Sequence, residues 1–282
     1  MIEPYQTQDF PGINLDLYAY CNAKCTFCSY PHMTRKRGAM SDEIFHKVID
    51  EVATLNTVFR IAPYFYGEPL MNPKFFEQCD YISEKLPDCP IELSTNGSLL
   101  SDEVITKLLR VKTLTFLNFS VYGGTKETYE KLIGLDFKTL DLIENCINRF
   151  RKERPDVVLF IGATPDLRFT IPGDTVELQR RFGNIVRIHN ISFSSQHEND
   201  LYMRKIPNSQ ACVVPEAGIV VLWDGRVGLC CFDANGDLVV GDVNKTTFVE
   251  AVNGDLAKKF RGVLKQGFKD VIPLCRTCTQ PI

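Results

Sequence analysis

Three cysteines near the start of the chain constrain its fold and chemistry more than any other feature. Cys21, Cys25 and Cys28 follow the spacing C-x3-C-x2-C. The alternating apolar and polar residues of Ile13–Leu17 predict a strand, so the cysteines lie on the loop that follows it. Clustered thiolates select zinc, copper or iron–sulfur centres. A closed site uses four protein ligands, and this run offers three, so a four-iron cluster here would leave one iron open to a small molecule.

Composition excludes several classes of function. The chain has 282 residues, enough for one large domain and one small one, with 44% hydrophobic and 24% charged residues. Its net charge of −3 suggests no basic face for nucleic acid or anionic membranes, and its apolar runs are too short to span a bilayer. Eleven cysteines without a secretory signal favour metal or redox use in a reducing compartment. We therefore expect a cytoplasmic protein with no nucleic-acid or membrane partner.

Predicted strands and helices alternate along the first two thirds of the chain. Such alternation indicates a parallel sheet with crossover helices. A complete eight-fold barrel takes about 250 residues and only about 190 are available here, which favours a partial (β/α)6 TIM-like barrel. Strands are expected at 13–17, 59–66, 91–94, 114–121, 157–164 and 185–191. Helices are expected at 41–55, 73–86, 101–109, 128–133, 139–150 and 175–182.

Polar and glycine-rich loops follow several of these strands. In barrels of this type the site lies at the carboxyl ends of the strands. The cysteine loop, Gly67-Glu68, Thr95–Gly97 and Tyr122–Gly124 all fall there. A basic turn, Thr34–Gly38, could cover the cluster or an anionic substrate group, but a solvated loop is the favoured interpretation.

The cysteine spacing, with the aromatic Phe27 just before the last cysteine, resembles the radical S-adenosylmethionine (SAM) superfamily. The resemblance implies a [4Fe–4S] cluster on Cys21, Cys25 and Cys28, whose fourth iron chelates SAM. It also implies reductive cleavage of SAM to a 5′-deoxyadenosyl radical, a small-molecule substrate, and an electron donor of the flavodoxin or ferredoxin type. The alternatives are a zinc site that borrows a distant cysteine, or plain buried thiols.

Other strand ends match the same family. Tyr66–Leu70 resembles its GEP motif, which grips the amino group of SAM, and Phe119–Gly123 resembles its S-x-D-G element. The resemblance assigns SAM contacts to Phe27, Gly67, Glu68, Ser94, Asn96 and Ser120. Ile133 stands where relatives often carry the arginine that holds the SAM carboxylate, so Arg168, or Lys131, would have to serve. No catalytic residue can be named.

The C-terminal part has a different pattern. Two β-rich runs, 217–223 and 226–231, are joined by Asp224-Gly225 and predict a hairpin, and a helical stretch at 256–265 follows. Such a module is too small to bury a core unaided, and a metal held by four thiolates would stabilise it.

The cysteine spacing of this module resembles the twitch domain, a shortened relative of the SPASM domain. The resemblance implies an auxiliary [4Fe–4S] cluster on Cys212, Cys230, Cys275 and Cys278, and domains at 1–205 and 206–282. Adjacent strand residues face opposite sides, so Cys230 and Cys231 do not easily share one cluster. The family pattern favours Cys230, and periodicity leaves the choice open. A structural zinc site is the alternative.

Together these features predict a radical SAM oxidoreductase, an α/β protein with a partial barrel followed by a hairpin-plus-helix twitch domain. The cysteine spacing is similar to that of a cyclitol dehydrogenase of the family, so we expect oxidation of an alcohol to a ketone in a sugar- or cyclitol-like molecule. The auxiliary cluster would accept an electron. An epimerase or a peptide-modifying enzyme is the alternative within the family. A zinc or iron–sulfur protein with a structural or sensing role is the alternative outside it.

Overall fold

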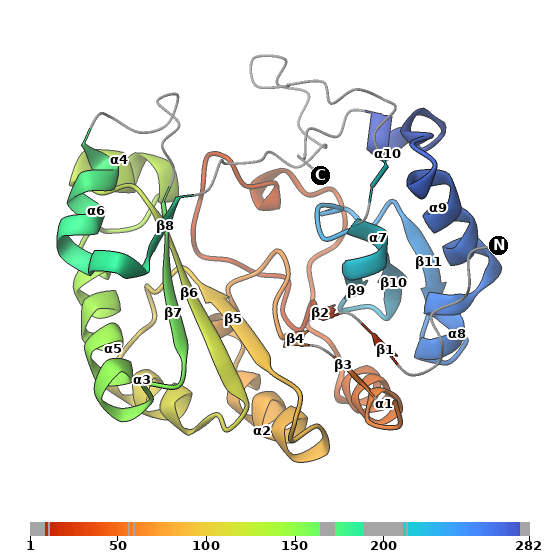
Figure 1. Ribbon diagram of the computed structural model, residues 1–282, viewed down its shortest axis with the longest axis horizontal. Coiled ribbons are helices and arrows are strands. Elements are labelled where there is room, and N and C mark those ends of the chain that lie inside the picture. Colours follow the sequence, from red (N-terminus) through yellow and green to blue (C-terminus); the bar gives the residue numbers. More distant parts are fainter. Residues whose placement is uncertain are drawn as a thin grey trace. The chain divides into compact units, whose positions relative to one another are not determined.

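A computed structural model describes residues 9–10, 12–55, 57–58, 60–163, 173–188, 211–212 and 214–276 (Figure 1). Contacts divide the chain into two compact units. The first comprises Met1–Tyr20, His32–Gly67 and Ser192–Ile282, and the second comprises Cys21–Pro31 and Glu68–Ile191. The two domains expected from the sequence are the continuous ranges 1–205 and 206–282. The two units are each assembled from separate segments of the chain, so the domain limits stay a prediction.

The second unit contains a run of parallel strands. They lie in the order β5 (Ile91–Thr95), β6 (Leu114–Tyr122), β7 (Val158–Ala163) and β8 (Val186–Ile188). Figure 1 shows α3 to α6 on one side of β6 to β8. The helices are α2 (Phe75–Lys85), α3 (Asp102–Arg110), α4 (Lys126–Ile133), α5 (Thr139–Glu153) and α6 (Asp174–Phe182), with short 3-10 turns η2 (Pro69–Met71) and η3 (Gly183–Ile185).

Local sequence explains these elements well. The Ser101 hydroxyl accepts a hydrogen bond from Val104 N at 3.2 Å and starts α3, as its position before two acidic residues predicts. In β5, Ile91 and Leu93 are fully buried whereas Ser94 between Leu93 and Thr95 is half-buried. Because successive strand residues face opposite sides, Ser94 lies on the face away from this apolar core.

The first unit is built around β2 (Ile13–Leu15). This strand pairs in parallel with β4 (Ile61–Ala62) and with β9 (Ile219–Val221). Antiparallel pairs then join β9 to β10 (Arg226–Gly228) and β10 to β11 (Val239–Asp242). The predicted hairpin is therefore confirmed, and its turn contains Gly225 at φ +90°, a conformation that favours glycine. The addition of β9 to β2 was not expected. A separate pair joins β1 (Asp9–Phe10) to β3 (Thr57–Val58).

Helices of the first unit begin with α1 (Asp42–Val52), whose N-cap Ser41 accepts from Ile44 N at 3.2 Å as predicted. The others are α7 (Val214–Ala217), α8 (Phe248–Asn253), α9 (Asp255–Lys265) and α10 (Pro273–Arg276), with η4 (Lys269–Val271). The short turn η1 (Tyr30–His32) follows the cysteine loop, and its first two residues belong to the second unit. No helix in the described part of the chain is long and apolar enough to cross a membrane.

Several expected strands are shorter than predicted, among them 13–17, which forms β2 over Ile13–Leu15 only. The stretch 59–66 forms only the two-residue β4, because Pro63 cannot donate to a ladder and the chain turns from there toward Gly67. The stretch 185–191 begins with the last residue of η3 and contributes β8, and its end lies outside the described residues.

Candidate iron–sulfur and cofactor site

The cysteine loop is fixed on the C-terminal end of α4. Lys24 N donates to Ile133 O and Thr26 N donates to Leu132 O, both at 2.9 Å. The last carbonyls of a helix have no partner within it, so these bonds satisfy groups that would otherwise need water. Gly134 ends α4 at φ +73°, and a Cβ there would lie 3.1 Å from Lys24 Cβ. The left-handed backbone and the close approach of the loop therefore both favour glycine at this position.

Within the loop, the three thiols influence one another. Burial raises the pKa of Cys21 to about 11, and the charges of Glu68 and Cys28 add to the rise. Burial likewise raises the pKa of Cys25, with further contributions from Cys28 and Cys21, and burial raises the pKa of Cys28. Thiolates crowded in this way repel one another, and a bound cationic centre would reverse that penalty.

The arrangement of these thiols suits a cluster. Among the described residues, no three His, Cys, Asp or Glu side chains converge as ligands of a single metal ion. A four-iron cluster places each thiolate on a different iron, so its ligands do not need to meet at one point. The mutual electrostatic influence of Cys21, Cys25 and Cys28 and their soft sulfur donors fit that group.

Glu68, the first residue of the longer segment of the second unit, provides a buried carboxylate. Its Oε1 accepts from Thr95 Oγ1 at 2.6 Å and from Leu70 N at 3.1 Å, and its Oε2 accepts from Asn96 N at 2.8 Å. The residue is 2% exposed, and burial raises its pKa to about 7. Three donors thus hold the group in one orientation, where a ligand amino group would find an oriented acceptor.

Gly67 immediately precedes this acid and permits no side chain. A Cβ at this residue would lie 2.0 Å from Tyr18 O and 3.0 Å from Tyr20 O. Backbone atoms cannot yield as flexible side-chain ends do, so the close approach requires glycine. The glycine of the GEP-like motif therefore has a packing reason of its own.

A polar network joins the cysteine loop to the end of β5. Asn96 Nδ2 donates to Asn22 Oδ1 at 2.9 Å, and Asn22 Nδ2 donates to Ser98 Oγ at 2.9 Å. Asn96 Oδ1 accepts from Ser98 N at 2.9 Å and from Ser98 Oγ at 2.7 Å. Sequence reasoning missed Asn22 and Ser98. The signal available was a polar residue between two cysteines and an Asn-Gly-Ser turn after a strand.

The end of β6 is held in an unusual conformation. Among the described residues, Tyr122 is the one non-glycine residue with positive φ, at +60°. Its ring meets the Phe27 ring edge-on, with centroids 4.9 Å apart. Asp174 Oδ1 accepts from Gly124 N and from Thr125 N, each at 2.9 Å. Sequence reasoning missed Asp174, because nothing local relates it to a loop fifty residues earlier.

The remaining predicted SAM contacts are placed only in part. Ser94 Oγ accepts from Asn118 Nδ2 at 3.2 Å. Ser120 is half-buried on β6, in register with Gly162 of β7. Arg168 lies outside the described residues. The SAM-binding roles of these residues, and of Phe27, Gly67, Glu68 and Asn96, stay predictions.

The C-terminal cysteines gather around one small apolar cluster. Cys212, Cys230 and Cys275 all pack against it, and its buried members are Leu238, Leu264 and Ile272. Burial raises the pKa of Cys230, and the charges of Cys231 and Cys275 contribute further. Three of the four predicted ligands thus share one region of the first unit, and Cys278 lies outside the described residues. Which of Cys230 and Cys231 is a ligand stays a prediction.

The favoured interpretation of the basic turn is wrong for one residue. Arg35 is buried, its Nη1 lies 2.8 Å from Asp16 Oδ2, and its Nε donates to Ala234 O at 2.6 Å. A guanidinium remains charged and is buried only with a counterion, which Asp16 supplies. Lys36 and Arg37 are exposed, as expected for a solvated loop.

Comparison with known proteins defines the class of this protein. Residues 15–177 match the Radical SAM superfamily, and residues 212–279 match SPASM, an iron–sulfur cluster-binding domain. The first match covers more than half of the chain, so the chain belongs to the radical SAM superfamily. The expected cofactors are confirmed at this level: a SAM-binding [4Fe–4S] cluster, SAM, and an auxiliary iron–sulfur cluster.

Particular relatives are similar along different shares of the chain. The S-adenosyl-L-methionine-dependent 2-deoxy-scyllo-inosamine dehydrogenase of Niallia circulans is 23% identical over 270 residues, covering 95% of this chain and 92% of that protein. The AdoMet-dependent heme synthase of Methanosarcina barkeri is 31% identical over 121 residues, covering 43% of this chain and 33% of that protein.

Solved structures show the fold. The crystal structure of BtrN in complex with AdoMet and 2-DOIA matches with TM-score 0.68 and 20% identity, covering 96% of this chain and 93% of that one. Native anSMEcpe with bound AdoMet matches with TM-score 0.68 and 17% identity, covering 95% of this chain and 88% of that one. The predicted fold class, a partial barrel with a SPASM-like C-terminal part, is confirmed.

Proposed function

We propose that this protein is a radical SAM dehydrogenase that oxidises an alcohol of a sugar- or cyclitol-like molecule to a ketone. The observation that carries the proposal is the similarity to 2-deoxy-scyllo-inosamine dehydrogenase over 95% of this chain and 92% of that protein. The grouping of Cys212, Cys230 and Cys275 around one apolar cluster supports it, because an oxidation needs an electron acceptor.

At the first cysteine loop, Cys21, Cys25 and Cys28 would hold the SAM-binding cluster. A reduced cluster held there together with SAM would supply the radical chemistry that removes a hydrogen atom from a substrate C–H bond. The chain's own residues fix the geometry: Asn22 ties the loop to Asn96 at 2.9 Å. Glu68, oriented by its three donors, would accept a hydrogen bond from the SAM amino group.

At the C-terminal cysteines, the chemistry needed is removal of one electron. Loss of a hydrogen atom from a C–H bond leaves one electron too many for a ketone, and loss of the hydroxyl proton does not remove it. Cys212, Cys230, Cys275 and Cys278 would hold a cluster fully ligated by protein. The burial that raises the pKa of Cys230 also lowers the local dielectric, one of the features that sets iron–sulfur potentials.

A peptide-modifying function is the second candidate. Native anSMEcpe with bound AdoMet and the Cp18Cys peptide matches this chain with TM-score 0.67 at 19% identity. That likeness covers the fold of 96% of this chain and favours no particular peptide. We favour the small-molecule substrate because the sequence similarity to the dehydrogenase covers 95% of this chain and 92% of the dehydrogenase.

The electron donor proposed for the first cluster is a flavodoxin- or ferredoxin-type protein. A cytoplasmic location is proposed because free thiols and reduced iron–sulfur clusters persist in reducing compartments. Both proposals follow from the chemistry of the cofactors.

The proposed function is tested with oxygen-free, reconstituted protein, dithionite, SAM and a panel of aminocyclitols and sugars. We expect 5′-deoxyadenosine and a ketone in equal amounts with a true substrate. Oxidation leaves no hydrogen on the reacting carbon, so a reaction run in heavy water should yield no alcohol that carries deuterium at that carbon. An alcohol product with inverted configuration and deuterium at the inverted carbon would show an epimerase instead. Formation of 5′-deoxyadenosine that only peptides stimulate would overturn the choice of substrate class.

A further inference from the structure

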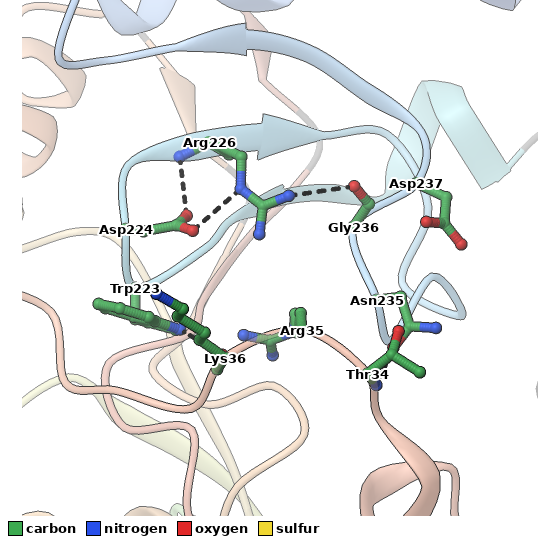
Figure 2. Close-up of a pocket in the computed structure, with 9 residues that line it drawn as sticks. All are labelled: Thr34, Arg35, Lys36, Trp223, Asp224, Arg226, Asn235, Gly236 and Asp237. Atoms are coloured by element: carbon green, nitrogen blue, oxygen red, sulfur yellow. Dashed lines mark hydrogen bonds and ion pairs between the residues drawn. The ribbon is translucent and has the colours of Figure 1, made fainter.

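A pocket of about 380 Å³ lies within the first unit (Figure 2). Its walls are the segment Thr34–Lys36, the turn after β9 with the first residue of β10, and residues 235–237. The turn after β9 lies beside the end of β2, because Asp16 N donates to Val221 O at 2.9 Å. The pocket is therefore at the carboxyl ends of two parallel strands, where ligands of α/β folds bind.

Arg226 is held in a fixed position on one wall. Its Nε donates to Asp224 Oδ2 at 2.9 Å and its Nη1 donates to Gly236 O at 3.3 Å. Among the described residues, Nη2 makes no hydrogen bond, and Figure 2 shows the guanidinium directed into the space above Arg35. A guanidinium already immobilised loses little entropy when it binds a ligand.

Arg35 lies below it and is not fully satisfied. Its side chain is 3% exposed, and its Nη2 has no hydrogen-bond partner in the described part of the chain. A buried N–H without an acceptor is unfavourable, because it has lost its hydrogen bonds to water without replacement. An oxygen atom of a ligand that entered this pocket would supply the missing acceptor.

The charges of the pocket indicate which ligand class it suits. Asp16 and Asp224 neutralise the two guanidinium groups. Lys36 and Asp237 add one charge of each sign to the lining. No net charge remains to select an ion, yet donors and acceptors stand close together. A hydroxyl group both donates and accepts, so a molecule with several hydroxyls can satisfy both kinds of partner.

We propose that this pocket recognises the hydroxyl groups of a neutral polyol ring, a sugar or cyclitol. Arg226 and Lys36 donate to hydroxyl oxygens of the ligand, and Asp237 accepts from its hydroxyl groups. The volume lies in the range that holds small-molecule ligands. The inference rests on the proposed function and deepens it, because it assigns substrate recognition to residues of the 34–36 segment and of the loops after β9 and before β11.

Trp223, the one tryptophan in the chain, lines the pocket and reports on it. Tryptophan fluorescence of the oxygen-free holoprotein is titrated with three neutral polyols: myo-inositol, scyllo-inositol and glucose. At least one should give a saturable change. Arg226→Gln should weaken that affinity at least tenfold and Asp237→Asn at least threefold. Lys258→Gln, an exposed cation of α9, should leave it unchanged.

The outcomes separate the pocket from the reaction. If none of the three probes changes the fluorescence, the proposed pocket is wrong. It is also wrong if both variants bind the polyol with the affinity of the wild type. A response to inorganic phosphate without one to the polyols overturns the ligand class. Turnover of a cyclitol with an unchanged KM in Arg226→Gln and Asp237→Asn also overturns the pocket while the proposed function stands. Polyol binding that both variants weaken, without any polyol-dependent SAM cleavage, supports the pocket and counts against the proposed function.

Discussion

Replacement of Asp174 by alanine should loosen the end of β6 on which the candidate site depends. Asp174 is 1% exposed, and its Oδ1 accepts from Gly124 N and Thr125 N at 2.9 Å each. A hydrogen bond to a charged group contributes about 1.5–3 kcal/mol, so losing both removes about 3–6 kcal/mol. Tyr122, at φ +60°, could then relax and regain about 1–3 kcal/mol. The expected net loss in the free energy of unfolding is about 3 kcal/mol.

Two matched variants make this prediction sharp. Asp174→Asn keeps an oxygen that can accept both bonds, so it should lose only about 1 kcal/mol. Asp88→Ala removes an exposed acid and should stay within about 0.5 kcal/mol of the wild type. The assay is urea denaturation of the oxygen-free holoprotein, monitored by circular dichroism. The Kd for SAM is measured on the same variants. An Asp174→Ala variant within about 1 kcal/mol of the wild type, or an asparagine variant as damaged as alanine, would refute the reasoning.

Three further predictions concern single groups. Burial raises the pKa of Glu68 from 4.5 to about 7, so its stabilising effect is fully present below pH 4.5 and is lost as the pH rises through 7. The free energy of unfolding of the SAM-free protein should fall by about 2 kcal/mol between about pH 5.5 and 8. In Glu68→Gln, the midpoint of urea denaturation should depend less on pH than it does in the wild type. A Cβ at residue 67 would lie 2.0 Å from Tyr18 O, so Gly67→Ala should lower stability by about 3 kcal/mol in urea denaturation. Arg35→Met leaves the buried carboxylate of Asp16 unpaired and should cost about 3–5 kcal/mol, and a double-mutant cycle with Asp16→Asn should recover at least half.

Elements with local signals could be predicted from the sequence. Ser41 and Ser101 each precede two acidic residues, and both cap the helices expected there. The Asp224-Gly225 turn joins β9 to β10, because only a residue that tolerates positive φ closes such a hairpin. The cysteine spacing is a local signal of the same kind, because the three proposed cluster ligands lie close together in the sequence.

Long-range partners could not be predicted. The Asp16–Arg35 pair and the hydrogen bonds of Asp174 join residues whose proximity depends on how strands and loops assemble. The parallel pairing of β9 with β2 has the same origin, because a hairpin signal says nothing about which strand lies beside it. Asn22 falls in between: its place among the cysteines was visible, but its bond to Asn96 was not.

The most direct test of the account is release of 5′-deoxyadenosine and methionine by oxygen-free, dithionite-reduced protein in which one cysteine is replaced. The account assigns Cys21 to the cluster that binds SAM and leaves Cys79, fully buried in α2, without a role in it. Cys79→Ala should therefore release both products as the wild type does, and Cys21→Ala should release none. Continued release by Cys21→Ala would contradict the claim that the C-x3-C-x2-C loop carries the chemistry.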